Sequence, residues 1–229
     1  MMGLCGQGAV AIWHDIAPEG RDEFYAWHGQ QHMAERVAIP GFLRGRRYVG
    51  IDAQLEFFNL YETADVDVPR GKDYAERLNH PTPWTLQTVP HFRSVARSIC
   101  HVGFSQGRAQ GGLMATLRYD VAAANVDAHL DALRQRFLPA LAGGPGVAGV
   151  HLLLADDQAS GEANAEQRAR GAANAVPRWI ILVEGWGDES PFIALARTQL
   201  DQEAMERLGA VGSIDLDIYR HQITVADAN

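Results

Sequence analysis

The feature that most constrains this chain is an internal repeat. Pro40-Gly41 and Pro145-Gly146 each end the first expected helix of one half of the sequence, and their prolines stand 105 residues apart, at 145 and 40. Around each dipeptide the hydrophobic pattern gives the same order of strand, helix, strand, strand, helix, strand. The chain therefore divides into two related units of a little over a hundred residues, at 1–106 and 107–229.

The expected elements follow from alternation, helical periodicity and breakers. In the first unit, strands are predicted at 9–16, 42–49, 55–61 and 95–104, with helices at 21–38 and, in two pieces broken at 80–83, at 72–89. In the second unit, strands are predicted at 113–119, 147–154, 179–186 and 214–225, with helices at 126–141 and 190–208. Residues 155–177, rich in Ala, Gly, Asn, Gln and charge, are interpreted as a mobile or weakly helical surface insertion, to which no chemistry is assigned.

A β-α-β-β-α-β order is the ferredoxin-like arrangement, an antiparallel sheet with both helices on one face. The other face of each sheet needs a cover. The strands are apolar on both sides, as Phe57 beside Phe58 and the run 152–154 indicate, so neither face is expected to meet water. We therefore predict an α+β fold in which the two tandem ferredoxin-like units pack their sheets face to face as a barrel within one chain, with further homodimerisation optional.

Composition excludes several classes of function. The formal net charge of −8 opposes binding to nucleic acid or an anionic membrane. The sequence has no apolar run of about 18 residues and no early basic region of a signal peptide, so a cytoplasmic protein is expected. Two cysteines, Cys5 and Cys100, are too few for a disulfide framework, and free thiols are expected although their strands are neighbours.

The densest polar cluster lies on the first helix and the strand after it. With a helical period, His28 lies at the edge of the apolar side and His32 further round. On the following strand, alternation places Phe42, Arg44, Arg46 and Tyr48 on one face and Leu43, Arg47 and Val49 on the other.

The repeat provides an internal control for this cluster. At an offset of 105, His28 corresponds to Leu133, His32 to Phe137, Glu35 to Ala140 and Arg36 to Leu141. The fold therefore does not require these polar residues, because the second copy does without them. We infer a specialised site in the first unit.

Imidazoles suit acid/base chemistry at neutral pH, so His28 and His32 are the candidate catalytic residues. The candidate substrate-binding residues are Trp27, Glu35, Arg46, Arg47, Tyr48, Tyr61 and Trp84. A metal site is the alternative for the histidines, but His28 and Glu35 are separated by about 10 Å of helical rise, so no metal is assigned. The alternative to a functional site is that these residues are purely structural: buried, hydrogen-bonded histidines, salt-bridged surface arginines and aromatic residues of the core.

The segments Phe24-Tyr25-Ala26-Trp27-His28, His32-Met33-Ala34-Glu35-Arg36, Ile39-Pro40-Gly41-Phe42 and Arg46-Arg47-Tyr48 together resemble the EthD-like branch of the dimeric α+β barrel superfamily. The resemblance spans about 25 residues; beyond it, only the order of elements agrees. It implies a small, often aromatic ligand between helices and sheet, and directs attention to His28 and His32. Relatives include cofactor-independent monooxygenases, lactone isomerases, decarboxylases and haem-binding enzymes.

Three hypotheses follow. The first is a pocket protein, with no cofactor, that carries out acid/base chemistry on a small aromatic or carbonyl metabolite as a monooxygenase, isomerase or decarboxylase. The second is a non-catalytic ligand-binding or structural protein. The third is haem binding through a histidine. Fold-level likeness selects no reaction among them.

Overall fold

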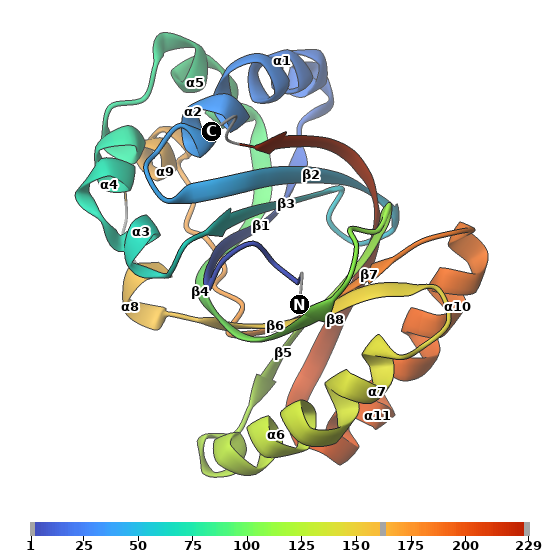
Figure 1. The fold of residues 1–229 in the computed structure, drawn as a ribbon. Helices are drawn as coiled ribbons and strands as arrows, with labels where there is room; N and C mark the ends of the chain where they lie inside the picture. The colour runs from blue at the N-terminus through green and yellow to red at the C-terminus, as the bar shows by residue number, and fades with distance from the viewer. Residues whose placement is uncertain (1–2, 161–163, 227–229) are drawn as a thin grey trace.

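A computed structural model describes residues 3–160 and 164–226. Its strands form one closed antiparallel barrel in the order β1-β3-β2-β8-β5-β7-β6-β4 (Figure 1). The strands are β1 (Gly8–Ile16), β2 (Phe42–Asp52), β3 (Phe57–Thr63), β4 (Phe92–Gly107), β5 (Leu113–Val121), β6 (Val147–Ala155), β7 (Trp179–Gly185) and β8 (Ala210–Ala226). The predicted α+β architecture and barrel closure are confirmed.

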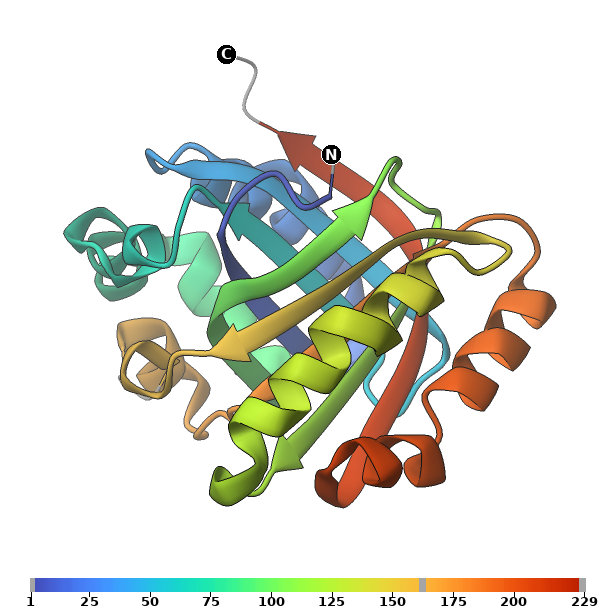
Figure 2. The same ribbon diagram turned by 60° about the horizontal axis from the view of Figure 1, so that its bottom comes forward.

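Helices cover the barrel on two opposite sides (Figures 1 and 2). The first side carries α1 (Arg21–Trp27), α2 (Met33–Val37), α3 (Asp67–Arg70), α4 (Lys72–Asn79) and α5 (Pro83–Thr88). The opposite side carries α6 (Val126–Ala132), α7 (Leu138–Ala142), α10 (Glu189–Gln199) and α11 (Gln202–Leu208). Among the described helices, not one combines the length and the apolar character needed to cross a membrane.

From the first to the second strand of each unit, corresponding elements begin at the same offset in the sequence. β1 and β5, α1 and α6, α2 and α7, and β2 and β6 all begin 105 residues apart. The helix stop is conserved in conformation, since Gly41 has φ +90° and Gly146 has φ +76°. This left-handed backbone favours glycine after a helix, which explains the Pro-Gly landmarks. The correspondence of His28 with Leu133 is therefore structural as well as sequential.

The two units close the barrel through two shared edges. β2 pairs with β8 and β4 pairs with β6, both antiparallel, so each unit completes the sheet of the other. The interior is filled by large side chains from both units, including Trp13, Tyr48, Phe58 and Tyr219. Each strand is thus buried by the barrel interior on one face and by helices on the other, as its two-sided apolar pattern predicts.

Charged groups also lie inside the barrel and join the two units. Arg46 on β2 lies 2.9 Å from Glu62 and 2.9 Å from Glu184 on β7. The His151 ring lies 3.3 Å from the same Glu184 carboxylate. Burial alone would raise the pKa of Glu184, but the hydrogen bond from His151 and the charge of Arg46 outweigh it and hold that pKa at about 2.

One detail of the strand prediction is wrong. A β-bulge between Phe42 and Arg44 shifts the alternation, so Phe42 packs on the helical side against Tyr61 and Tyr74 rather than beside Arg46. The insertion forms two short helices, α8 (Asp157–Ser160) and α9 (Ala165–Arg170), which lie on the first unit's side (Figure 1). Its residues 161–163 lie outside the described part.

Disrupting the buried pair between the units is expected to destabilise the barrel. Glu184→Gln leaves Arg46 without one of its carboxylates in a dry interior, so the free energy of unfolding should fall by about 3 kcal/mol in urea titrations. Asp52→Asn removes the partner of Arg197 in a pair whose side chains are 39% and 47% exposed, and should cost about 1 kcal/mol or less. Equal losses in the two variants would contradict this assignment.

Candidate functional site

The first helix of the chain contains a π-helical turn at His28–His32 between α1 and α2. Its i→i+5 hydrogen bonds make a wider turn than the α-helix and rotate the following residues back toward the sheet. His28 and His32 are consequently both buried, at 3% and 9% exposure, although an α-helical wheel places His32 further round from the apolar side than His28. The second unit has the same turn at Leu133–Phe137, so the backbone device is shared and only its side chains differ.

Aromatic rings surround the two imidazoles. The His28 and His32 rings stack with centroids 5.5 Å apart, and the Trp27 ring lies 4.1 Å from His32. Phe24 packs against His28 at 5.1 Å. Burial lowers the pKa of His28 and of His32 well below the usual 6.5, and the positive charges of Arg47 and Arg36, respectively, lower them further. Both imidazoles are therefore neutral at pH 7.

His28 is held between two polar partners. Arg47 Nη1 lies 3.3 Å from His28 Nδ1, and Tyr61 Oη lies 3.5 Å from His28 Nε2. Because arginine can only donate, Nδ1 accepts and the ring proton is on Nε2, from where it is directed at the tyrosine oxygen. Tyr61 then keeps its own hydroxyl proton for another acceptor. Gly45 allows this arrangement, since a Cβ there would lie 2.8 Å from the Tyr61 ring.

His32 faces a different surrounding. Its Nδ1 atom is buried and has no hydrogen-bond partner among the described residues. The ring lines a cavity of about 70 Å³, the inner cavity, together with Trp27, Tyr61 and Arg36. A buried polar atom without a partner carries a free-energy penalty, so it marks a position where a ligand group or water is accommodated.

The insertion closes this cavity from the second unit. Glu166, Gln167 and Arg170 of α9, with Asn174 after it, line the inner cavity. Glu166 forms an ion pair with the buried Arg36 guanidinium. The segment expected to be a mobile surface excursion therefore contributes to the wall of the first unit's cavity.

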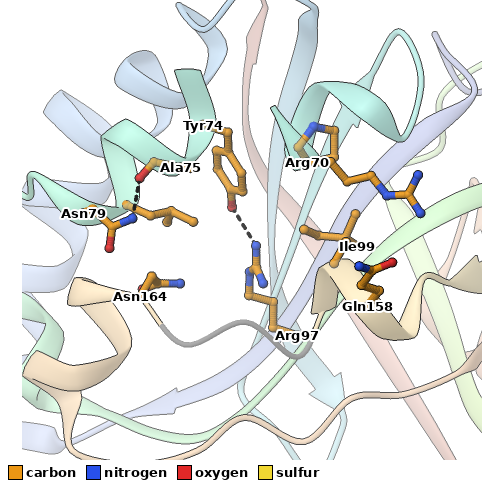
Figure 3. Close-up of a pocket in the computed structure, with 11 residues that line it drawn as sticks. Arg70, Tyr74, Ala75, Asn79, Arg97, Ile99, Gln158 and Asn164 are labelled. Carbon is orange, nitrogen blue, oxygen red and sulfur yellow. Dashed lines mark hydrogen bonds between the residues drawn. The ribbon is translucent and has the colours of Figure 1, made fainter. Parts of the chain in front are cut away.

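A second cavity of about 390 Å³, the outer cavity, adjoins the inner one (Figure 3). Tyr74, Leu78, Arg97 and Asn164 line both. In Figure 3 the Tyr74 hydroxyl and the Arg97 guanidinium meet across this region, and their hydrogen bond is 3.1 Å long. The volume of the outer cavity lies within the range of roughly 300–1,000 Å³ that is usual for small-molecule sites.

The structure separates the sequence-predicted residues into groups. Trp27, His32 and Tyr61 line the inner cavity, and His28 and Arg47 lie directly behind Tyr61. By contrast, Arg46 and Tyr48 are on the other face of the sheet, inside the barrel.

Two further candidates lie elsewhere on the helices. Trp84 donates its indole N–H to Glu23 and packs beside Phe24 and Trp27. Glu35 is half-buried on α2 and is not among the residues that line either cavity. Neither residue therefore adjoins the cavity beside His32.

Sequence reasoning missed Tyr74, Arg97 and Arg170 as wall residues. Arg97 had a detectable signal, because it is a charged residue within the apolar run of β4 and is only 8% exposed. Arg170 had none, since its position depends on how the insertion crosses between units. Cys5 and Cys100, with Cys5 exposed and Cys100 buried, are both free thiols.

The inner cavity beside His32 does not accommodate a haem. The inner cavity of about 70 Å³ is far smaller than a porphyrin, and His28 is occupied by Arg47 and Tyr61. Within the described residues, no group of three or more His, Cys, Asp or Glu side chains is arranged to hold a metal ion.

Comparison with solved structures supports the fold. An anthrone oxidase-like protein superimposes with a TM-score of 0.65 at 17% identity, covering 97% of this chain and 93% of that one. A candidate monooxygenase from Lactobacillus acidophilus NCFM gives 0.58 at 14% identity, covering 96% of both chains. A ferredoxin-fold protein related to antibiotic biosynthesis monooxygenases, from Listeria monocytogenes 4b F2365, gives 0.51 at 13%, covering 96% and 97%.

No protein-family model and no curated protein matches the sequence. These structural likenesses confirm the predicted α+β barrel fold. Because these sequences are less than one-fifth identical to this chain, the roles of their individual residues are not transferred to it. None of these structures tests the resemblance to the EthD-like branch.

Neutral buried histidines make stability depend on pH. His32 is neutral in the folded state and protonates near pH 6.5 in the unfolded state, so stability is lost as pH falls below that value. The loss is about 1.4 kcal/mol per pH unit for each such histidine. In urea titrations, His32→Gln should reduce the loss between pH 7 and 5.5 by about 1 kcal/mol relative to the unaltered chain. Identical pH dependence in both would refute a neutral His32.

Proposed function

We propose that this protein binds a small aromatic, carbonyl-bearing molecule between the first helix and the sheet of its first unit, and that His32 acts on it as a general base without a bound cofactor. One observation carries the proposal: a neutral imidazole, unpartnered at Nδ1 among the described residues, lines a cavity with aromatic walls. A neutral imidazole is in the protonation state that a general base needs at pH 7.

The ring of the ligand is assigned to the aromatic walls. Trp27, Tyr61 and Tyr74 present flat surfaces to the cavities, and such surfaces favour stacked or edge-on packing of another ring. The outer cavity provides the volume that the inner cavity lacks, so the reacting atom is assigned to the inner cavity and the bulk of the molecule to the outer one.

Tyr61 is assigned to the carbonyl oxygen. The Arg47–His28–Tyr61 contacts leave the tyrosine proton free to donate, and Tyr61 lines the inner cavity beside His32. In the proposed step, a C–H bond conjugated with the carbonyl breaks and its proton moves to His32. The electron pair of that bond enters the conjugated π system, and the carbonyl π pair becomes the enolate oxygen charge that Tyr61 stabilises. His28 and Arg47 are positioning residues that act through Tyr61.

This proton abstraction is the first step of more than one reaction. Return of the proton at another carbon completes an isomerisation, and capture of the carbanion by dioxygen begins an oxidation. Two of the solved structures with this fold are an anthrone oxidase-like protein and a candidate monooxygenase, which favours the second course. Anthrone is a suitable first test compound because loss of its ring CH₂ proton gives an aromatic enolate.

Non-catalytic binding is the second candidate. The space beside His32, about 70 Å³, accommodates only about two water molecules as it stands, so a protein that merely holds a ligand in the outer cavity also fits the geometry. The two functions differ in whether a product forms, and in whether His32 matters to anything besides affinity.

Replacing His32 is expected to separate chemistry from binding. With anthrone as substrate, His32→Gln should lower kcat about 10²- to 10⁴-fold, the usual contribution of a general base, with a small change in calorimetric affinity for a non-reacting aromatic ketone. Because the pKa of His32 is well below 6.5, kcat/KM should stay level from pH 8 down past 6.5.

The matched control is His80→Gln, an exposed histidine beyond α4, which should keep full activity. Product formation at the unaltered rate in His32→Gln would overturn the role of His32. Saturable binding with no product from any aromatic ketone tried would favour the non-catalytic alternative.

A further inference from the structure

Positive charge is concentrated around the two cavities of an otherwise acidic protein. Arg36 and Arg170 line the inner cavity, Arg70 lines the outer one, and Arg97 lines both. Glu166 neutralises Arg36, and Asp156 pairs with Arg70. Among the described residues, neither Arg97 nor Arg170 forms an ion pair with a carboxylate.

Arg97 reaches the site from the sheet. It lies on β4 and is 8% exposed. Its Nη2 atom donates to Tyr74 Oη at 3.1 Å, which leaves further donors of the five-donor guanidinium available toward the cavities. Because Tyr74 accepts this hydrogen bond, its own hydroxyl proton is available to a ligand in the same place.

Arg170 reaches the site from the insertion. It is the last residue of α9, and its Nη2 atom donates to Asn174 Oδ1 and to the Ala172 carbonyl, while its Nε atom is buried and has no described partner. Burial lowers the pKa of Arg170; the charge of Glu166 acts against this, and that of Arg97 adds to it. Two arginines that repel each other in a low-dielectric site favour an anion between them.

We propose that Arg97 and Arg170 together bind a carboxylate group of the ligand, with Tyr74 donating to the same group. The planar guanidinium fork matches a carboxylate in geometry, and the aromatic walls beside it suit the ring of an aromatic acid. The inference rests on the proposed function, and it narrows the ligand of that site to an aromatic molecule bearing a carboxylate as well as the carbonyl.

The two arginines come from different units of the repeat. Arg97 belongs to the first unit, and Arg170 lies in the insertion between β6 and β7 of the second. The first unit therefore supplies His32 and the aromatic walls, and the second unit supplies half of the anion contact. Selectivity for charge is thus assigned to the segment that has no counterpart in the first half of the chain.

The test compares a charged ligand with its neutral counterpart. Calorimetric titrations with 2-naphthoate and 2-naphthamide should show at least about tenfold tighter binding of the carboxylate to the unaltered protein, equivalent to about 1.4 kcal/mol. Arg97→Gln and Arg170→Gln should each reduce this preference toward unity while leaving naphthamide affinity unchanged. Arg178→Gln is the matched control, because Arg178 follows the same insertion, is 64% exposed and pairs with Asp157, and it should keep the full preference.

Folding is checked by the thermal midpoint. Replacing an arginine that has no described carboxylate partner is not expected to lower Tm. Arg170 is half-buried at a helix terminus, so the Arg170→Gln variant carries the test if the Arg97→Gln variant does not fold. Unchanged naphthoate affinity in both variants would overturn the carboxylate contact.

The remaining outcomes separate this inference from the proposed function. Equal binding of both ligands by the unaltered protein would overturn the carboxylate contact and leave the aromatic pocket standing. Absence of saturable binding of either ligand up to about 10 mM would overturn both, since even a Kd of 1 mM corresponds to about 4 kcal/mol of binding free energy.

Discussion

Each sheet of this protein has two faces to bury and only one layer of helices, and the rest of the structure follows from that constraint. Pairing of β2 with β8 and of β4 with β6 rolls the two sheets into one barrel and removes every open edge. Side chains from both units then fill the barrel interior, whereas each outer layer of helices comes mainly from one unit. A pocket between helix and sheet is consequently local to a unit, and the two units are free to differ there.

The repeat shows how that freedom is used. Both units retain the π-helical turn, but Leu133 and Phe137 stand in the second where His28 and His32 stand in the first. Leu133 is part of the apolar core of its unit, whereas His32 borders a cavity and has a buried nitrogen without a described partner. The second unit therefore stabilises the barrel by plain packing, and the first accepts a less stable arrangement at the place assigned to chemistry.

Much of this could be predicted from the sequence because it depends on local pattern. The element order, the barrel and the correspondence of the halves follow from periodicity and from Pro-Gly stops. The exposure of His32 could not, because a π turn leaves no residue signature and changes the side that a histidine faces. The bulge at Phe42 similarly reverses an alternation by one residue. The position of α9 depends on its ion pair with Arg36, 130 positions away in the chain, and on contacts with α4, which no local pattern encodes.

The position of α9 also explains why the two units belong in one chain. In a symmetric pair of identical units, any segment covering one pocket would cover the other as well, and both pockets would carry the same charges. Fusion allows β6 and β7 to be separated by a long connection in one unit only, so that the second unit contributes Glu166 and Arg170 to the pocket of the first. An arginine that is shielded from water and has no carboxylate partner among the described residues is costly to a fold, and Arg97 and Arg170 both lie at the pocket that contains His32.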